Sequence, residues 1–155
     1  MKKFLFIASH GITLVIGFAL GVYFLPILIE PPAADIAAVE SVLDAPTFTT
    51  TFSRNRQDSD AFHWGEGELR LYEDTIVFEG KLAPGPDYRL YLVPDFVETE
   101  AAFVALKNDA VDVGSVKNFN RFVLNDIGAA SDPTYNTAVI WCETFGQFIT
   151  SGQYR

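Results

Sequence analysis

Residues 75–93, TIVFEGKLAPGPDYRLYLV, decide the fold of the larger part of this chain. They hold two runs of β-forming residues, Thr75 to Leu82 and Tyr88 to Val93, separated by a segment with two prolines and a glycine. Proline fixes φ and Gly85 tolerates the positive φ of tight turns, so the segment predicts a turn between two strands. In the second run, Tyr88, Leu90 and Leu92 fall on one face and Arg89, Tyr91 and Val93 on the other, as expected for a strand.

Short runs of similar texture lie on both sides of this segment. At the centre of the run Thr137 to Phe145, apolar residues occupy both the odd and the even positions. This pattern predicts a strand covered on both faces. Residues 97–106 fit a helix or a strand equally well. With about eight short strands in all, the pattern predicts an all-β fold, a small antiparallel β-sandwich or barrel-like domain over residues 47–155. The other predicted strands are Thr47–Phe52, Glu68–Tyr72, Val111–Lys117, Arg121–Leu124 and Phe148–Tyr154.

The N-terminal part has a different character. Residues 4–29 contain no Asp, Glu, Lys or Arg, and a helix of that length measures about 39 Å, more than the ~30 Å of a hydrocarbon core. We therefore expect one transmembrane anchor over residues 4–29. Lys2 and Lys3 precede it and Glu30 follows it, so the positive-inside rule leaves residues 1–3 as a cytoplasmic tail and sends the remainder outside.

A cleaved signal peptide is the alternative interpretation of this segment. It shares the charged start, and Pro31 to Ala34 offers small residues near a cleavage point. Signal peptides usually have apolar regions of only ~7–15 residues, so the length favours a retained signal-anchor. Residues 30–46 start with two helix-stopping prolines and are interpreted as a linker. The expected location is a bacterial inner (plasma) membrane, single-pass, with the C-terminal domain periplasmic or extracellular.

Charge narrows the range of partners. Nine of the eleven basic residues and all twenty acidic residues follow the apolar segment, which gives the exported part a net charge of −11. Such a domain repels nucleic acid and anionic lipid. The expected partners are membrane lipid, through the N-terminal helix, and an envelope protein or redox partner.

Cysteine and histidine are scarce. Cys142 is the single cysteine, in a location where cysteines normally occur as disulfide pairs. It is therefore a buried structural thiol, an intermolecular partner, a reactive thiol or a ligand. His63 is the single histidine of the exported part, so a three-histidine zinc site and a CxxC redox pair are excluded, and no metal site is predicted. A cofactor site using Cys142 and His63 remains, because thiolate and imidazole are both axial ligands of haem.

Several motifs together resemble one known family. They are His63-x-Gly65-x-Gly67, Gly85-Pro86-Asp87 leading into Tyr91-Leu92, and Tyr135 followed by Val139-Ile140-Trp141-Cys142, and they are similar to those of the DM13 domain. The resemblance covers residues 48–155. It implies a β-rich extracytoplasmic domain with Cys142 as the hallmark residue. It also implies a role in electron transfer, through a bare thiol or through a prosthetic group such as haem.

The sequence thus supports two functional hypotheses of different class. The first is a membrane-anchored redox protein centred on Cys142, its expected catalytic residue, with Cys142 and His63 as expected cofactor-binding residues. The second is a non-enzymatic binding or scaffolding domain in which Cys142 is only a buried structural thiol. A hydrolase is disfavoured, because the chain has no GxSxG motif and a single histidine outside the anchor.

Overall fold

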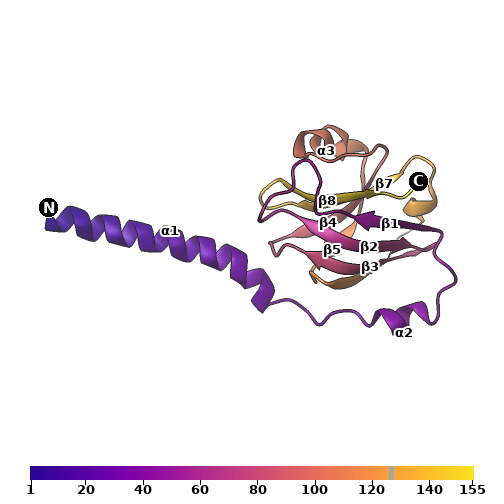
Figure 1. Ribbon diagram of the computed structural model, residues 1–155, viewed down its shortest axis with the longest axis horizontal. Coiled ribbons are helices and arrows are strands. Elements are labelled where there is room, and N and C mark those ends of the chain that lie inside the picture. Colours follow the sequence, from indigo (N-terminus) through magenta and orange to yellow (C-terminus); the bar gives the residue numbers. More distant parts are fainter. Residues whose placement is uncertain (126–127) are drawn as a thin grey trace.

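The computed structural model describes residues 1–125 and 128–155. A long helix, α1 (Lys2–Leu28), extends away from the strands, and the N-terminus lies at its far tip (Figure 1). Within the described residues, α1 is the one helix long and apolar enough to cross a membrane, and none of its residues is buried in the protein. A signal sequence near the N-terminus can also meet these criteria of length and composition.

Two antiparallel four-stranded sheets make up the rest. The order in the first sheet is β1-β2-β3-β6 and in the second β5-β4-β7-β8, and Figure 1 shows the sheets as layers of one sandwich. This confirms the predicted fold class and selects the sandwich over the barrel. The strands are β1 (Phe48–Phe52), β2 (Gly65–Leu71), β3 (Thr75–Leu82), β4 (Tyr88–Val93), β5 (Val111–Val116), β6 (Arg121–Asn125), β7 (Thr137–Cys142) and β8 (Gln147–Gln153).

The proline-rich turn carries the chain from one sheet to the other. β3 belongs to the first sheet and β4 to the second, and the residues between them cross the end of the sandwich. Asp87 has φ +53°, in the left-handed region, and its carbonyl oxygen accepts a hydrogen bond from the Glu143 N–H at 3.0 Å. The turn is therefore tied to the segment that follows β7.

β7 is buried on both faces, as its sequence predicted. Its inward side chains join the core between the sheets, which includes Leu90, Ile140 and Ile149. Its outward side chains Val139 and Trp141 lie in a second cluster with Phe103. Phe103 belongs to α3 (Glu100–Leu106), which makes the greater part of residues 97–106 a helix and covers the outer face of the second sheet.

The segment after α1 lies against the sandwich. Two residues beyond the helix, the Glu30 carboxylate accepts the Phe119 N–H at 2.8 Å, and the Asn118 amide donates to the Pro31 carbonyl oxygen at 2.9 Å. The short helix α2 (Ile36–Glu40) then buries Ile36 against the outer face of the first sheet. Hydrogen bonds and packing thus hold the residues between α1 and β1 against the strands.

One pair of glycines permits the close pairing of β2 and β3. Gly67 and Gly80 are opposite each other in the register. A Cβ added at Gly80 would lie 2.2 Å from the Glu66 carbonyl oxygen, and one at Gly67 would lie 2.5 Å from the Glu79 carbonyl oxygen. Backbone cannot yield as a flexible side chain does, so both positions require glycine.

We predict that Gly80→Ala lowers the free energy of unfolding by about 1–3 kcal/mol, the usual cost of overpacking. The measurement is urea denaturation of the full chain in detergent, with unfolding monitored by circular dichroism. Lys81→Ala, an exposed change one residue along the same strand, is the control and should cost far less. Equal midpoints for the two variants would contradict the close approach of β2 and β3.

Candidate functional site

Cys142 is the last residue of β7 and faces the space between the sheets. It pairs with Tyr88 of β4 in the register, and only 2% of its surface is exposed. Its Sγ donates a hydrogen bond to the Pro86 carbonyl oxygen at 3.0 Å. The end of β7 and the turn after β3 therefore meet at this sulfur.

The surroundings of Cys142 keep its thiol protonated. Burial raises the pKa of the Cys142 thiol above its ordinary value, and the Asp87 and Glu143 carboxylates raise it further. The backbone N–H groups of Phe145 and Thr144 point toward the sulfur and act in the opposite direction, but the pKa stays raised. The thiol of Cys142 therefore lacks the exposure and the low pKa that thiol exchange requires.

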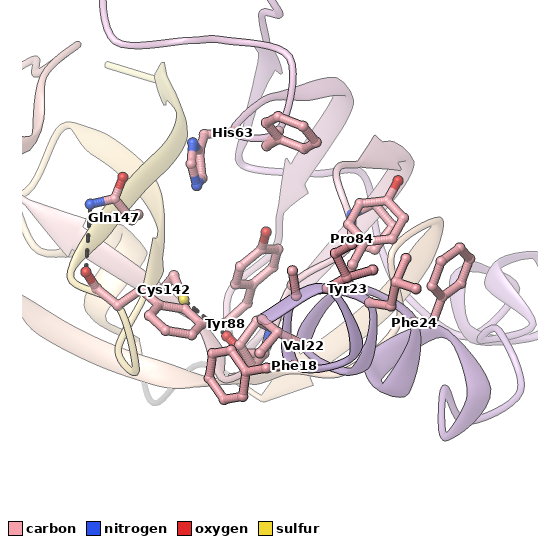
Figure 2. A pocket seen from close by; sticks show the side chains of 16 residues that line it. Phe18, Val22, Tyr23, Phe24, His63, Pro84, Tyr88, Cys142 and Gln147 are labelled. Atoms are coloured by element: carbon pink, nitrogen blue, oxygen red, sulfur yellow. Dashed lines mark hydrogen bonds between the residues drawn. The ribbon is translucent and has the colours of Figure 1, made fainter. Parts of the chain in front are cut away.

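Cys142 lies in the wall of a cavity of about 650 Å³ at this end of the sandwich. Figure 2 shows His63 and Tyr88 in the same wall, with the C-terminal half of α1 along one side. The structure thus brings the two residues singled out from the sequence, Cys142 and His63, to one cavity. Its lining is mostly apolar: Ile16, Phe18, Ala19, Leu20, Val22, Tyr23 and Phe24 from α1, and Phe62, His63, Pro84, Gly85, Pro86, Tyr88, Cys142, Phe145 and Gln147 from the sandwich.

His63 is oriented by Asp60. One carboxylate oxygen of Asp60 accepts the backbone N–H groups of Phe62 and His63, each at 2.7 Å, and the other lies 2.9 Å from His63 Nδ1. The hydrogen bond from His63 is the main reason that the pKa of Asp60 is lowered. An ionised Asp60 assigns the proton to Nδ1 and leaves Nε2 free to bind a ligand.

Close packing explains why Gly65, in the His63-x-Gly65-x-Gly67 motif, is a glycine. A Cβ at Gly65 would lie 2.6 Å from side-chain atoms of both Leu82 and Thr150, and the Thr150 hydroxyl donates to the Gly65 carbonyl oxygen at 3.2 Å. β2 and β8 thus approach closely at Gly65, where β2 begins. His63, which lies just before it, lines the same cavity as Cys142.

Tyr88 contributes a phenol to the cavity. Burial raises the pKa of its hydroxyl, and Gly85 leaves room for the ring, because a Cβ there would lie 2.4 Å from the Tyr88 oxygen. No hydrogen bond joins this hydroxyl to another described residue. The hydroxyl is therefore a neutral donor available to a molecule in the cavity.

Glu143 follows Cys142 in the sequence but faces the other side of the sheet. Its carboxylate accepts a hydrogen bond from the Tyr91 hydroxyl and pairs with the Lys107 ammonium at 2.7 Å. Although burial raises the pKa of Glu143, these two contacts lower it overall. The carboxylate is thus fully engaged on the outer face, under α3, and is not placed to deprotonate the thiol.

The described residues hold no group of three or more His, Cys, Asp or Glu side chains arranged to bind a metal ion. The site instead offers one thiol and one imidazole in an apolar cavity. Sequence reasoning identified Cys142 and His63 but missed Asp60, Tyr88 and the wall formed by α1. The spacing of Asp60 three residues before His63 was a local signal for the first of these, whereas the others depend on tertiary contacts.

We predict that Cys142 reacts slowly with an aromatic disulfide reagent when the chain is folded and carries no bound group. The rate should be on the order of a hundredfold lower than in the unfolded chain. The rate should increase as pH rises above about 8.5, because the raised pKa delays formation of the thiolate. Release of the coloured product, followed at several pH values from about 8 upward, measures the rates of the folded and the unfolded chain. Equal rates in the folded and unfolded chain would contradict the burial of this thiol.

Comparison with known proteins identifies the family of the chain. Neither a curated protein nor a solved structure matches the chain. A family model described as Electron transfer DM13 matches residues 51–154, which include His63 and Cys142. Since the match covers nearly the whole sandwich and most of the chain, this protein belongs to the DM13 family.

Proposed function

We propose that this protein is a membrane-anchored electron-transfer protein in which Cys142, with His63, holds a redox group in the cavity at the end of the sandwich. The observation that carries the proposal is that these two side chains line one apolar cavity, in a chain whose family is described as Electron transfer DM13. A single cysteine excludes dithiol chemistry. A redox role therefore needs either a bare thiol or a bound group, and the raised pKa of Cys142 favours the bound group.

The residues present fit a haem. The cavity of about 650 Å³ lies within the ~300–1,000 Å³ usual for ligand and cofactor sites. Thiolate and imidazole are both haem ligands, and a coordinated metal deprotonates a thiol whatever its pKa in the free protein. The N–H groups of Thr144 and Phe145 would stabilise the negative sulfur. When bound, the group would supply one-electron oxidation and reduction.

The chain's own residues have separate tasks in this proposal. Cys142 would hold the group through its sulfur, giving up its proton to solvent together with its hydrogen bond to the Pro86 carbonyl oxygen. Asp60 holds the His63 ring so that Nε2 is available. Phe62 and Phe145 line the cavity and would exclude water from it, and the Tyr88 hydroxyl would be available to donate a hydrogen bond to the group.

The anchor supplies the location. α1 is a retained single-pass span, with Lys2 and Lys3 on the cytoplasmic side and the sandwich outside, in the periplasm if the membrane is a bacterial inner membrane. The acidic sandwich then faces a compartment in which an unpaired cysteine is exposed to oxidants. Burial at 2% exposure protects Cys142 from them. The bound group would exchange electrons with an envelope redox partner.

A second function is favoured by one specific observation. Cys142 is part of the core cluster between the sheets and donates to a backbone carbonyl, which is also how a purely structural thiol behaves. In that case the sandwich is a binding or scaffolding domain for another envelope protein. The presence or absence of a bound chromophore separates the two functions.

We predict that full-length protein, purified from membranes in mild detergent, absorbs visible light and that dithionite changes the spectrum. Cys142→Ser should abolish the absorption and His63→Gln should shift or weaken it, because each removes one ligand. His10→Gln, a change of the other histidine, within α1, is the control and should leave the spectrum unchanged. A folded, colourless protein in every case would contradict the redox proposal and support the scaffold.

We also predict that α1 is retained in the mature protein. The chain should stay in the membrane pellet after alkaline carbonate extraction, and its intact mass should include residues 1–29. External protease should digest the sandwich in spheroplasts, since the positive-inside rule places it outside. A soluble mature form that starts after residue 29 would show that the segment is a cleaved signal peptide.

A further inference from the structure

The exit of α1 fixes which end of the sandwich is closest to a membrane. α1 ends at Leu28, and Glu30 is already hydrogen-bonded to the Phe119 N–H at 2.8 Å. Two residues span at most about 7 Å, so the turn between β5 and β6 lies beside the end of the helix. The side-chain amide of Asn118 donates to the carbonyl oxygen of Pro31 at 2.9 Å and strengthens the same contact one residue further along.

The site is at this same end. Tyr88 begins β4 and Cys142 ends β7, and the two are paired in the register. α1 is 27 residues long, or about 40 Å, against a hydrocarbon core of ~30 Å. The excess of about 10 Å corresponds to roughly the last six or seven residues, which rise out of the hydrocarbon, and the cavity lined by residues 16–24 borders that level. The cavity of Cys142 thus lies at the level where the membrane ends.

Two large apolar side chains are exposed beside the cavity. Phe62 is 64% exposed and Phe145 is 48% exposed, and both line the cavity that α1 borders. They belong to two different loops of the sandwich, one before β2 and one between β7 and β8. Exposed aromatic residues at one end of a domain, next to a membrane span, are typical of contact with the interfacial region of a bilayer.

The charges at this end suit the polar layer of a neutral membrane. Lys117 is exposed, lines a second cavity with Leu25, Pro26 and Ile29 of the helix exit, and has no ion-pair partner among the described residues. Its ammonium is placed to meet a lipid phosphate. Asp60 is paired with His63 and the Glu30 carboxylate is hydrogen-bonded, while the net charge of the exported part, −11, opposes binding to anionic lipid.

We propose that this end of the sandwich docks on the outer surface of the membrane, with Phe62 and Phe145 inserted among zwitterionic phospholipids. The inference rests on the retained anchor proposed above and goes beyond it, because an anchor alone leaves the domain free to face any direction. Docking turns the mouth of the Cys142 cavity toward lipid. The partner that reaches this site is then membrane-bound or lipid-soluble, and a water-soluble protein is excluded from it.

The test compares two exposed threonines at opposite ends of the sandwich. Full-length chain carrying Cys142→Ser receives a single cysteine by Thr144→Cys, beside Phe145, or by Thr134→Cys, in the connection before β7. Each is labelled with a polarity-sensitive fluorophore in phosphatidylcholine nanodiscs. We expect blue-shifted emission, and quenching by lipids with a nitroxide near the headgroup, at position 144 and not at position 134.

A second variant tests the aromatic contacts. Phe62→Ser with Phe145→Ser, in the chain labelled at position 144, should shift the emission toward that in water and reduce the quenching. Water-like emission and equal, weak quenching at positions 144 and 134 would overturn the docking. Co-purification of the chain with the nanodiscs reports the anchor separately, so loss of the anchor is distinguished from a domain that is anchored but undocked.

Discussion

The burial of β7 on both faces is the constraint on which the rest of this structure depends. Its inward side chains complete the core between the two sheets, and its outward side chains require α3 to cover them. A central strand of this kind has little freedom to shift, because a slip of one residue would exchange two apolar but differently shaped faces. Cys142 is therefore held at a fixed depth, where the strand ends and the turn after β3 crosses between the sheets.

That position determines the chemistry of the thiol. Burial raises its pKa and a backbone carbonyl oxygen accepts its hydrogen bond, so Cys142 is poorly suited to attack a disulfide as a free thiolate. Coordination to a metal removes the same proton without requiring a low pKa. The cavity next to the sulfur, bordered by an imidazole held in one orientation by Asp60, has the composition of a cofactor site. The fold thus favours a ligand role for Cys142 over thiol exchange.

Local pattern predicted much of this molecule. The strands around the proline-rich turn, the double burial of β7 and the apolar α1 follow from periodicity and length. Residues 97–106 remained ambiguous by periodicity, although the Thr99 side chain, which accepts the Ala102 N–H at 3.2 Å, is a helix-capping signal. The division of β3 and β4 between two sheets depends on long-range packing, as does the meeting of His63 with Cys142. Nothing in the apolar pattern of α1 indicated that it borders the cavity.

We propose that the sulfur of Cys142 binds a redox-active metal group, and X-ray absorption spectroscopy at the metal edge of the purified full chain detects such a bond. The chain has one cysteine and one methionine, Met1 at the far end of α1, so a sulfur ligand near His63 can only be Cys142. The account predicts one sulfur in the first coordination shell, absent in Cys142→Ser. A shell of nitrogen and oxygen alone, or a folded protein without metal, would contradict it.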